Sequence, residues 1–427
     1  LADVTFVDAL HGWAVGDHGA IWHTANGGEH WHPQHSPVRC SIRSVYFLNQ
    51  RTGWAVGGVS HRYTHVTSGI VLRTDDGGAH WVEWQRNPLP SLSKIEFFNM
   101  QQGYAIGGSS AMYPQGLLLT NDGGRSWTAP PDDQPYRWLD GDFRDPAHGS
   151  LSAAGGVAAA MRKGAFLPAE VADSAGSALR SIHFNDENIA YAVGDNGKLF
   201  ATRDGGLHWQ PNNSPFFDRL PTSFSAHTVT SQGPLIWIAG SPGTRILHSP
   251  DGGSHWEFQE TGQRLPLHDL HFADQQKGWA VGAMGTIVAT KDGGKTWKLQ
   301  KGDPKRAAIL GVFPTARDVP LKLFAKLSAG EGYRSSVALI GRDAPTLVST
   351  PFDIPEQRTR DALIQSGVTA IDRASRLPLP ARGLNLPAEE ICRNWPLREG
   401  QHAERMLQAY LVQQIRIWRP DIIVTME

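Results

Sequence analysis

Short segments of alternating apolar and polar residues recur along about the first 300 residues of the chain. Each begins with an apolar residue, a polar residue and a phenylalanine, and a Gly-Trp/Tyr-Ala-Val/Ile-Gly segment or a close variant follows. Alternation with a period of two is typical of half-buried β-strands, and the glycines between the segments indicate turns. The first strands are expected at 4–6, 45–47, 95–97, 182–184 and 270–272, and the second at 12–16, 53–57, 103–107, 190–194 and 278–282.

An octapeptide follows these strands in six places and defines an internal repeat. Its pattern is Ser/Thr-x-Asp/Asn-Gly-Gly-x-Ser/Thr/His-Trp, and its tryptophans are spaced by 50, 46, 82, 47 and 41 residues. The 82-residue interval implies one unit that has lost its octapeptide, at about 136–178, where Asp142-Phe143 and residues 154–156 are faint echoes of the first two strands. Four short strands in each unit of 40 to 50 residues are the signature of a propeller blade. The sequence therefore predicts a seven-bladed β-propeller over residues 1–302.

The residues of the octapeptide have a structural explanation. The Asp or Asn side chain can accept backbone N–H groups, the two glycines supply positive φ angles, and the tryptophan can pack against the blade. A calcium site is the alternative, but each loop offers one or two carboxylates where calcium takes six to eight oxygen ligands. The residues predicted to be structural are Asn26 and Trp31, Asp76 and Trp81, Asp122 and Trp127, Asp204 and Trp209, Asp251 and Trp256, and Asp292 and Trp297.

These motifs resemble two known patterns. The octapeptides resemble the Asp-box, or bacterial neuraminidase repeat, and the longer phrases at 12–31 and 278–297 resemble the repeat of the photosystem II assembly and stability factor family. The resemblance covers about 300 residues and implies a propeller. It also implies a non-enzymatic role in protein interaction or assembly.

The expected strand directions separate two faces of the propeller. Loops between the second and third strands open at the start of the first strand, and the octapeptides lie at the opposite end. Two of these loops are enlarged, at 59–68 and 109–115, and loops longer than a hairpin needs often carry function. The residue eleven positions before each second-strand aromatic is expected on the same face, where it could contact a partner. The alternative is that these residues are solvated strand ends that form only weak surface pairs. The predicted partner-binding residues are Arg43, Arg180, His268, His61, Arg62, Tyr63 and Tyr113.

Residues 303–427 follow a different pattern. Apolar runs at 307–313 and 335–341, helical spacing at 320–330, 355–366 and 399–418, and a last strand at 421–425 predict a partial α/β, Rossmann-like domain. The segment resembles the LmbE-like (PIG-L) zinc-dependent de-N-acetylases. Where that family has its metal motif, only Asp318 matches; Thr315 takes the position of the histidine and Arg317 that of the catalytic base. We therefore expect no metal and no cofactor, and we expect the natural chain to continue beyond Glu427.

Composition narrows the functional classes. Forty Lys and Arg against 41 Asp and Glu give a net charge of −1, which predicts no nucleic-acid partner, and no apolar run is long enough for a transmembrane segment. The Arg-Ile-Pro phrase that usually opens a sialidase is absent. The function predicted is a non-enzymatic interaction module for a protein or peptide partner, with an extracytoplasmic location favoured. The alternative is a carbohydrate-active protein: a glycan-binding propeller with a de-N-acetylase-like domain, or a sialidase-like glycosidase.

Overall fold

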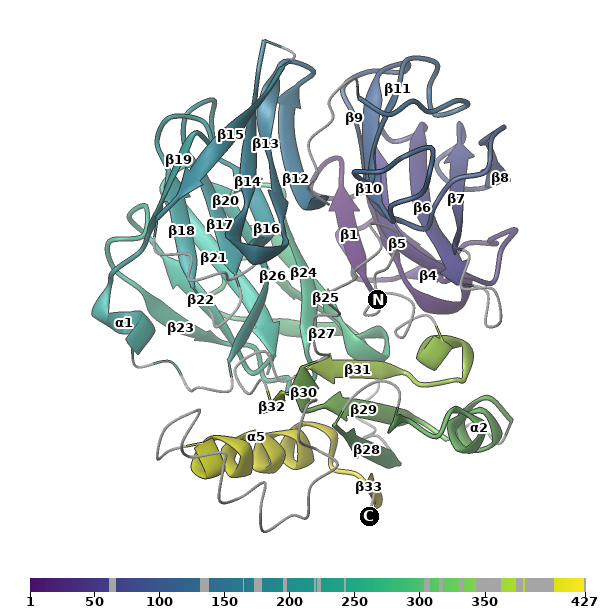
Figure 1. Ribbon diagram of the computed structural model, residues 1–427, viewed down its shortest axis with the longest axis vertical. Coiled ribbons are helices and arrows are strands. Elements are labelled where there is room, and N and C mark those ends of the chain that lie inside the picture. Colours follow the sequence, from purple (N-terminus) through teal and green to yellow (C-terminus); the bar gives the residue numbers. More distant parts are fainter. Residues whose placement is uncertain are drawn as a thin grey trace. The chain divides into compact units, whose positions relative to one another are not determined.

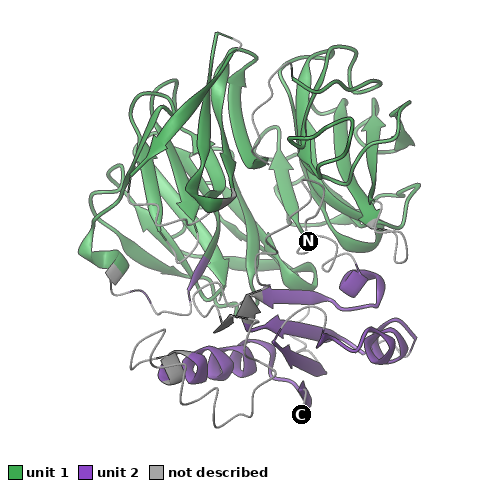
Figure 2. Cartoon of the chain, viewed as in Figure 1, with its two compact units in different colours: residues 1–219, 226–302 green, residues 220–225, 303–427 purple. Residues whose placement is uncertain are grey.

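The computed structural model divides the chain into two compact units, residues 1–219 with 226–302 and residues 220–225 with 303–427 (Figure 2). It describes residues 1–60, 67–130, 138–163, 165–172, 179–194, 198–218, 220, 224–241, 243–302, 308–314, 318–330, 333–342, 362–373, 379–380 and 403–425. No helix among these residues combines the length and the apolar character needed to cross a membrane.

The first unit is a β-propeller built from consecutive antiparallel sheets (Figure 1). Within the described residues it contains seven such groups of strands, called blades 1 to 7 here. Blade 1 is β1 (Asp3–Phe6), β2 (Gly12–Val15), β3 (Ile21–Thr24) and β4 (His32–Pro33); blade 2 is β5 (Ser41–Phe47), β6 (Gly53–Ser60), β7 (Thr67–Thr74) and β8 (Val82–Glu83); blade 3 is β9 (Leu92–Phe97), β10 (Gly103–Gly107) and β11 (Leu117–Thr120).

The remaining four blades continue the same order along the chain. Blade 4 is β12 (Trp138–Asp145), β13 (His148–Ala153), β14 (Ala158–Arg162) and β15 (Ala165–Val171); blade 5 is β16 (Leu179–Phe184), β17 (Ala190–Gly194), β18 (Leu199–Thr202) and β19 (His208–Pro211); blade 6 is β20 (Ser225–Gln232), β21 (Leu235–Ser241), β22 (Arg245–Ser249) and β23 (Glu257–Glu260), preceded by a short helix α1 (Pro215–Asp218); blade 7 is β24 (Leu267–Phe272), β25 (Gly278–Gly282), β26 (Ile287–Thr290) and β27 (Lys298–Lys301).

First strands lie side by side where the ring of blades closes. Strand β1 lies beside both β5 and β24, so the first and last blades are adjacent and the ring closes. Two hydrogen bonds between the first and last blades hold this junction. The Leu1 ammonium donates to the Gly282 carbonyl at 2.8 Å, and Trp279 Nε1 donates to the Gly27 carbonyl at 3.0 Å.

The hydrophobic core lies between the blades and is built from stacked aromatic rings. A second-strand tryptophan lies face to face on the first-strand phenylalanine of the next blade, with ring centroids 3.5–3.8 Å apart for Trp13–Phe47, Trp54–Phe97, Trp237–Phe272 and Trp279–Phe6. The indole nitrogens of these tryptophans donate to an octapeptide glycine of the next blade, at Gly77, Gly123, Gly293 and Gly27. These four octapeptides therefore join two blades as well as two strands.

Blade 4 departs from the repeat and corrects one expectation. Its second strand is β13, where Gly149 pairs with Phe143 as Gly12 pairs with Phe6. Residues 154–156 were expected to echo the second strand, but they form the 3₁₀ turn that follows it, and Gly155 and Gly156 have positive φ angles of 76° and 78°. The outer strand β15 also pairs in parallel with β19, which joins blades 4 and 5 into one eight-stranded sheet.

The second unit contains a parallel sheet with the strand order β31-β29-β28-β33. Its core includes Phe313, Phe324 and Val337, all at most 1% exposed. Asp318 lies between β28 and α2, and positions 315 and 317 are outside the described residues. The elements are β28 (Ile309–Phe313), α2 (Leu321–Phe324), a π-helical segment (Ala325–Gly330), β29 (Ser335–Leu339), β30 (Gly341–Arg342), β31 (Ala370–Arg373), β32 (Leu379–Pro380), α5 (Ala403–Trp418) and β33 (Ile422–Thr425).

Candidate functional site: the inner strands of the propeller

The residues expected at the channel mouth occupy one repeated backbone feature. Arg43, Arg180 and His268 are each the extra residue of a β-bulge near the start of a first strand, where the pairing register shifts. A bulged residue is left out of the strand ladder, so its side chain is aimed independently of the alternation on either side. The residues that lie eleven positions before the second-strand aromatic are therefore structurally equivalent in blades 2, 5 and 7.

The surroundings of these three residues differ. Arg180 is exposed, and Arg43 and His268 are half-buried. The His268 Nδ1 atom lies 2.8 Å from the Leu1 carbonyl oxygen, and its ring centroid is 5.8 Å from that of His227. The histidine therefore also supports the junction between blades 7 and 1.

The enlarged loops give a mixed outcome. His61, Arg62 and Tyr63 lie outside the described residues. The expectation that Tyr113 belongs to an exposed binding loop is wrong, because its side chain is 1% exposed and its hydroxyl donates to the Trp127 carbonyl at 3.0 Å. The ring fills the apolar cluster between blades 2 and 3, where burial raises its pKa.

The octapeptides form local hydrogen-bond networks at the other end of the six blades that carry them. In blade 2, Gly53 at the start of β6 pairs with Thr74 at the end of β7, and the bulge at Arg43 lies at the opposite end of the same sheet. In all six octapeptides the Ser or Thr hydroxyl accepts the second glycine N–H at 2.7–2.9 Å, and the Asp or Asn side chain accepts the N–H four residues on at 2.8–3.0 Å. Their tryptophans pack edge-on against first-strand phenylalanines in four blades.

Polar side chains just after the bulges join neighbouring inner strands. Three aspartates accept a backbone N–H group from an adjacent blade: Asp3 from Val45 at 2.7 Å, Asp140 from Ile182 at 2.8 Å and Asp269 from Val4 at 3.1 Å. Between blades 3 and 4, Lys94 Nζ forms an ion pair with Asp140 Oδ1 at 2.8 Å. These side chains therefore supply polar links between first strands of neighbouring blades.

A second set of polar residues lies two positions further along the inner strands. It contains the middle residue of each apolar-polar-phenylalanine segment, namely Thr5, Tyr46, Glu96, Asp142, His183 and His271. The variation of this residue among otherwise similar repeats is the signal in the sequence by which this set could be found. Among the described residues, no three His, Cys, Asp or Glu side chains are placed to hold a metal ion.

Burial strongly shifts the pKa values of three residues of this set. Burial, together with the charge of Asp142, raises the pKa of Glu96 to about 8 although Lys94 opposes the shift. Burial raises the pKa of Tyr46 to about 12 and lowers that of His271 to about 4. Glu96 Oε2 lies 2.5 Å from the Tyr104 hydroxyl, which lies 3.1 Å from the Gly141 carbonyl. The Tyr104 hydroxyl can donate to either oxygen and thus joins the Glu96 carboxyl group to the backbone of blade 4.

Glu96→Gln is expected to remove part of the pH dependence of stability. Because the folded pKa of about 8 lies above the ordinary value of 4.5, the folded state holds an additional proton between these two values. Stability from this proton is complete below pH 4.5 and is lost as the pH rises through 8. Urea unfolding should show the variant close to wild type at pH 5 and more stable by at least about 1 kcal/mol at pH 9.

The matched control for Glu96→Gln is Glu83→Gln, at an exposed position of β8. This control should keep the wild-type difference between the two pH values. An unchanged pH dependence in the Glu96 variant would show that this carboxyl group does not bind the additional proton.

Comparison with known proteins shows similarity to one family of assembly factors. The family model described as "Photosynthesis system II assembly factor YCF48" matches residues 1–89 and 169–268. A relative named "Photosystem II assembly lipoprotein Ycf48" from Synechococcus sp. (strain CC9902) is 31% identical over 124 residues, which are 29% of this chain and 36% of the relative. The chain therefore matches about a third of the length of this curated relative.

Solved structures share the propeller fold. A structure described as "YCF48 bound to D1 peptide" superposes with a TM-score of 0.53 at 21% identity, covering 68% of this chain and 92% of that one. An ancestral GH74 enzyme also superposes with a TM-score of 0.53, at 12% identity and with 71% and 47% coverage. Because one of these neighbours binds a peptide and the other is an enzyme, the shared fold does not by itself assign a function.

Proposed function

We propose that this protein is a non-enzymatic assembly factor of the photosystem II assembly factor type, whose propeller binds a segment of a partner protein. Support comes from the YCF48 family model, whose match covers blades 1, 2, 5 and 6, and from the structural likeness to YCF48 with a bound D1 peptide. The name of the Synechococcus relative, a lipoprotein, supports an extracytoplasmic location. A relationship of residues 303–427 to the LmbE-like de-N-acetylases stays a prediction.

The binding surface we propose is the end of the propeller that carries the bulges. The observation that carries this proposal is that Arg43, Arg180 and His268 occupy equivalent bulges of the inner strands. Two guanidinium groups at equivalent positions favour a partner segment that carries carboxylates, because guanidinium binds carboxylate with two parallel hydrogen bonds. Residues 61–63, which follow β6 in the sequence, are proposed to extend this surface.

Arg43→Gln combined with Arg180→Gln is expected to weaken binding of a D1-derived peptide at least ten-fold, about 1.4 kcal/mol or more, measured by isothermal titration calorimetry. The wild-type affinity should also fall as salt is raised, since the proposed contacts are between charges. The matched control is Arg51→Gln combined with Arg203→Gln, two exposed arginines at the octapeptide end of the blades.

The outcomes separate two parts of the proposal. Equal affinity of the Arg43/Arg180 variant and the wild type would remove the bulge surface as the binding site. Absence of any binding by the wild-type protein would rule out a D1-like segment as the partner.

A further inference from the structure

The first-strand phenylalanines of four blades are each enclosed by two tryptophans. Phe47 is stacked on Trp13 at 3.5 Å, and it meets the edge of Trp81 at 5.7 Å and 88°. Phe6, Phe97 and Phe272 have the same two neighbours: a stacked indole from the preceding blade and an edge-on indole from the octapeptide of their own blade. The repeat therefore fills this place with a fixed aromatic arrangement.

Blade 4 lacks both tryptophans around its own phenylalanine, Phe143. Tyr104 takes the place of the stacked indole, with its ring tilted by 57° at a centroid distance of 4.3 Å. The octapeptide is missing from the sequence of this blade, and Arg162 pairs directly with Ala165 where the other blades have the longer loop. The register of β14 and β15 places Phe166 where the other blades have the octapeptide tryptophan, so blade 4 supplies a smaller ring in place of the edge-on indole.

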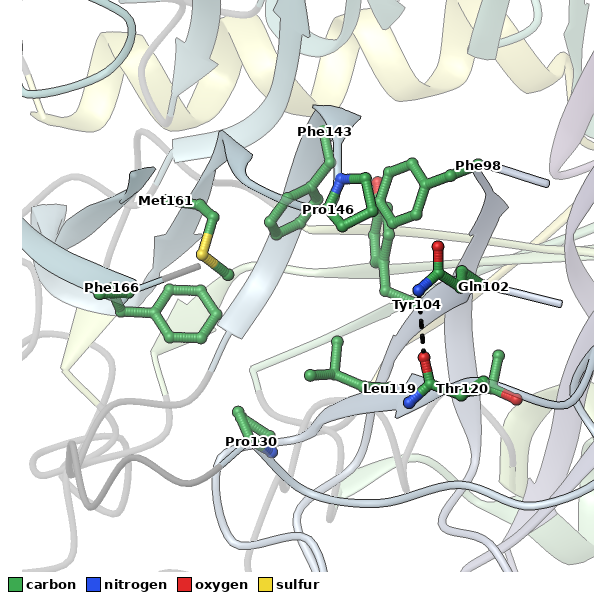
Figure 3. A pocket seen from close by; sticks show the side chains of 13 residues that line it. Phe98, Gln102, Tyr104, Leu119, Thr120, Pro130, Phe143, Pro146, Met161 and Phe166 are labelled. Atoms are coloured by element: carbon green, nitrogen blue, oxygen red, sulfur yellow. Dashed lines mark hydrogen bonds between the residues drawn. The ribbon is translucent and has the colours of Figure 1, made fainter. Parts of the chain in front are cut away.

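A cavity of about 410 Å³ lies at this place, between blades 3 and 4 (Figure 3). Phe98 and Leu119 of blade 3 face Phe143, Met161 and Phe166 of blade 4 across it. Thr120 and Asn121 of the blade 3 octapeptide also line the cavity, so it opens at the octapeptide end, opposite the bulges. The volume is within the range of small-ligand pockets.

The chemistry of the walls selects a neutral aromatic group. None of the residues found to line the cavity carries a charged side chain, and most of them are aromatic or aliphatic. Its polar part is a pair of amides, with Gln102 Nε2 3.5 Å from Asn121 Oδ1. Elsewhere in the propeller, side-chain amides accept indole N–H groups: Trp31 donates to Gln300 at 3.3 Å and Trp81 donates to Gln34 at 3.1 Å.

We propose that this cavity binds the indole side chain of a tryptophan in a partner polypeptide. The occupant follows from the repeat, because two indoles enclose the phenylalanine in four other blades, whereas the smaller rings of Tyr104 and Phe166 take their places here and leave the cavity. The neutral, aromatic walls match a neutral ring, and the amides of Gln102 and Asn121 offer acceptors for its N–H group. An apolar cavity can bind an aromatic molecule because the atoms that line it then form van der Waals contacts that are missing while the cavity is empty. The site is independent of the Arg43 surface.

N-acetyltryptophanamide is the probe for this site, followed by ligand-detected NMR. Wild-type protein should bind it saturably with one site per chain, and at least ten-fold more tightly than N-acetylalaninamide. Ala165→Leu adds a side chain at the exposed rim of the cavity and should weaken binding at least ten-fold. Leu119→Trp fills the cavity from the opposite wall and should have the same effect.

The matched control is Ala25→Leu, at an exposed octapeptide position where the six repeats carry six different residues. It should bind the probe as wild type does, and so should the Arg43/Arg180 double variant. No saturable binding to the wild type would overturn the proposal, as would undiminished binding to both filled variants once circular dichroism shows that they are folded.

Discussion

Trp279→Ala is expected to destabilise the propeller by about 3–5 kcal/mol, because it removes the aromatic contact that closes the ring. Trp279 is 2% exposed, stacks on Phe6 at 3.5 Å and donates to the Gly27 carbonyl. Both partners belong to blade 1, more than 250 residues away in the chain. Equilibrium unfolding in urea, followed by tryptophan fluorescence, measures the loss.

Trp279→Phe is the matched variant for this prediction. It keeps an aromatic ring against Phe6 and loses the N–H donor to Gly27, so it should cost less than the alanine variant, about 1–3 kcal/mol. A change below about 1 kcal/mol in the alanine variant would contradict closure through this contact, since a core tryptophan normally costs several times that amount.

Lys94→Met should also cost about 3–5 kcal/mol at pH 8, because it breaks a largely buried ion pair. The side chains of Lys94 and Asp140 are 28% and 13% exposed, and Asp142 and Glu96 lie close enough for their charges to raise the pKa of Lys94. Without the ammonium group these carboxyl groups repel one another. The loss should become smaller at pH 5, where carboxyl groups in an acidic cluster take up protons more readily.

Lys291→Met provides the comparison for Lys94→Met. Its ion pair with Glu29 at 3.2 Å is exposed, with side-chain exposures of 69% and 58%, so the change should cost under about 1 kcal/mol. Equal losses of stability in the two variants would contradict this prediction. A loss in the Lys94 variant that does not change with pH would also contradict it, because it would show that the ammonium group does not offset repulsion among these carboxyl groups.

The repeat could be read from the sequence because its signals are local. Glycines, hydroxyls and carboxylates of one octapeptide interact within eight residues, so each motif carries its own explanation. The bulge positions were also predictable, since a constant offset from the second-strand aromatic places Arg43 and Arg180 in the same register. What the sequence analysis predicted well therefore depended on spacing within one blade.

The contacts between blades could not be predicted in the same way. Lys94 and Asp140 are 46 residues apart, and nothing in either segment indicates that they pair. Tyr113 looked like a loop aromatic, and only the packing of blades 2 and 3 shows that it is buried. The cavity beside Phe143 depends on two absences, a missing octapeptide and a tyrosine in place of a tryptophan, whose joint effect appears only when neighbouring blades are brought together.

The pairing of β15 with β19 has a consequence for local opening of the propeller. Glu170 pairs with His208 and Val171 with Trp209, so backbone hydrogen bonds run between blades 4 and 5. Amide groups of this eight-stranded sheet share one network, and local unfolding tends to follow such hydrogen-bonded units. Blades 4 and 5 should thus lose protection against hydrogen–deuterium exchange together, as a single foldon that includes the blade without an octapeptide.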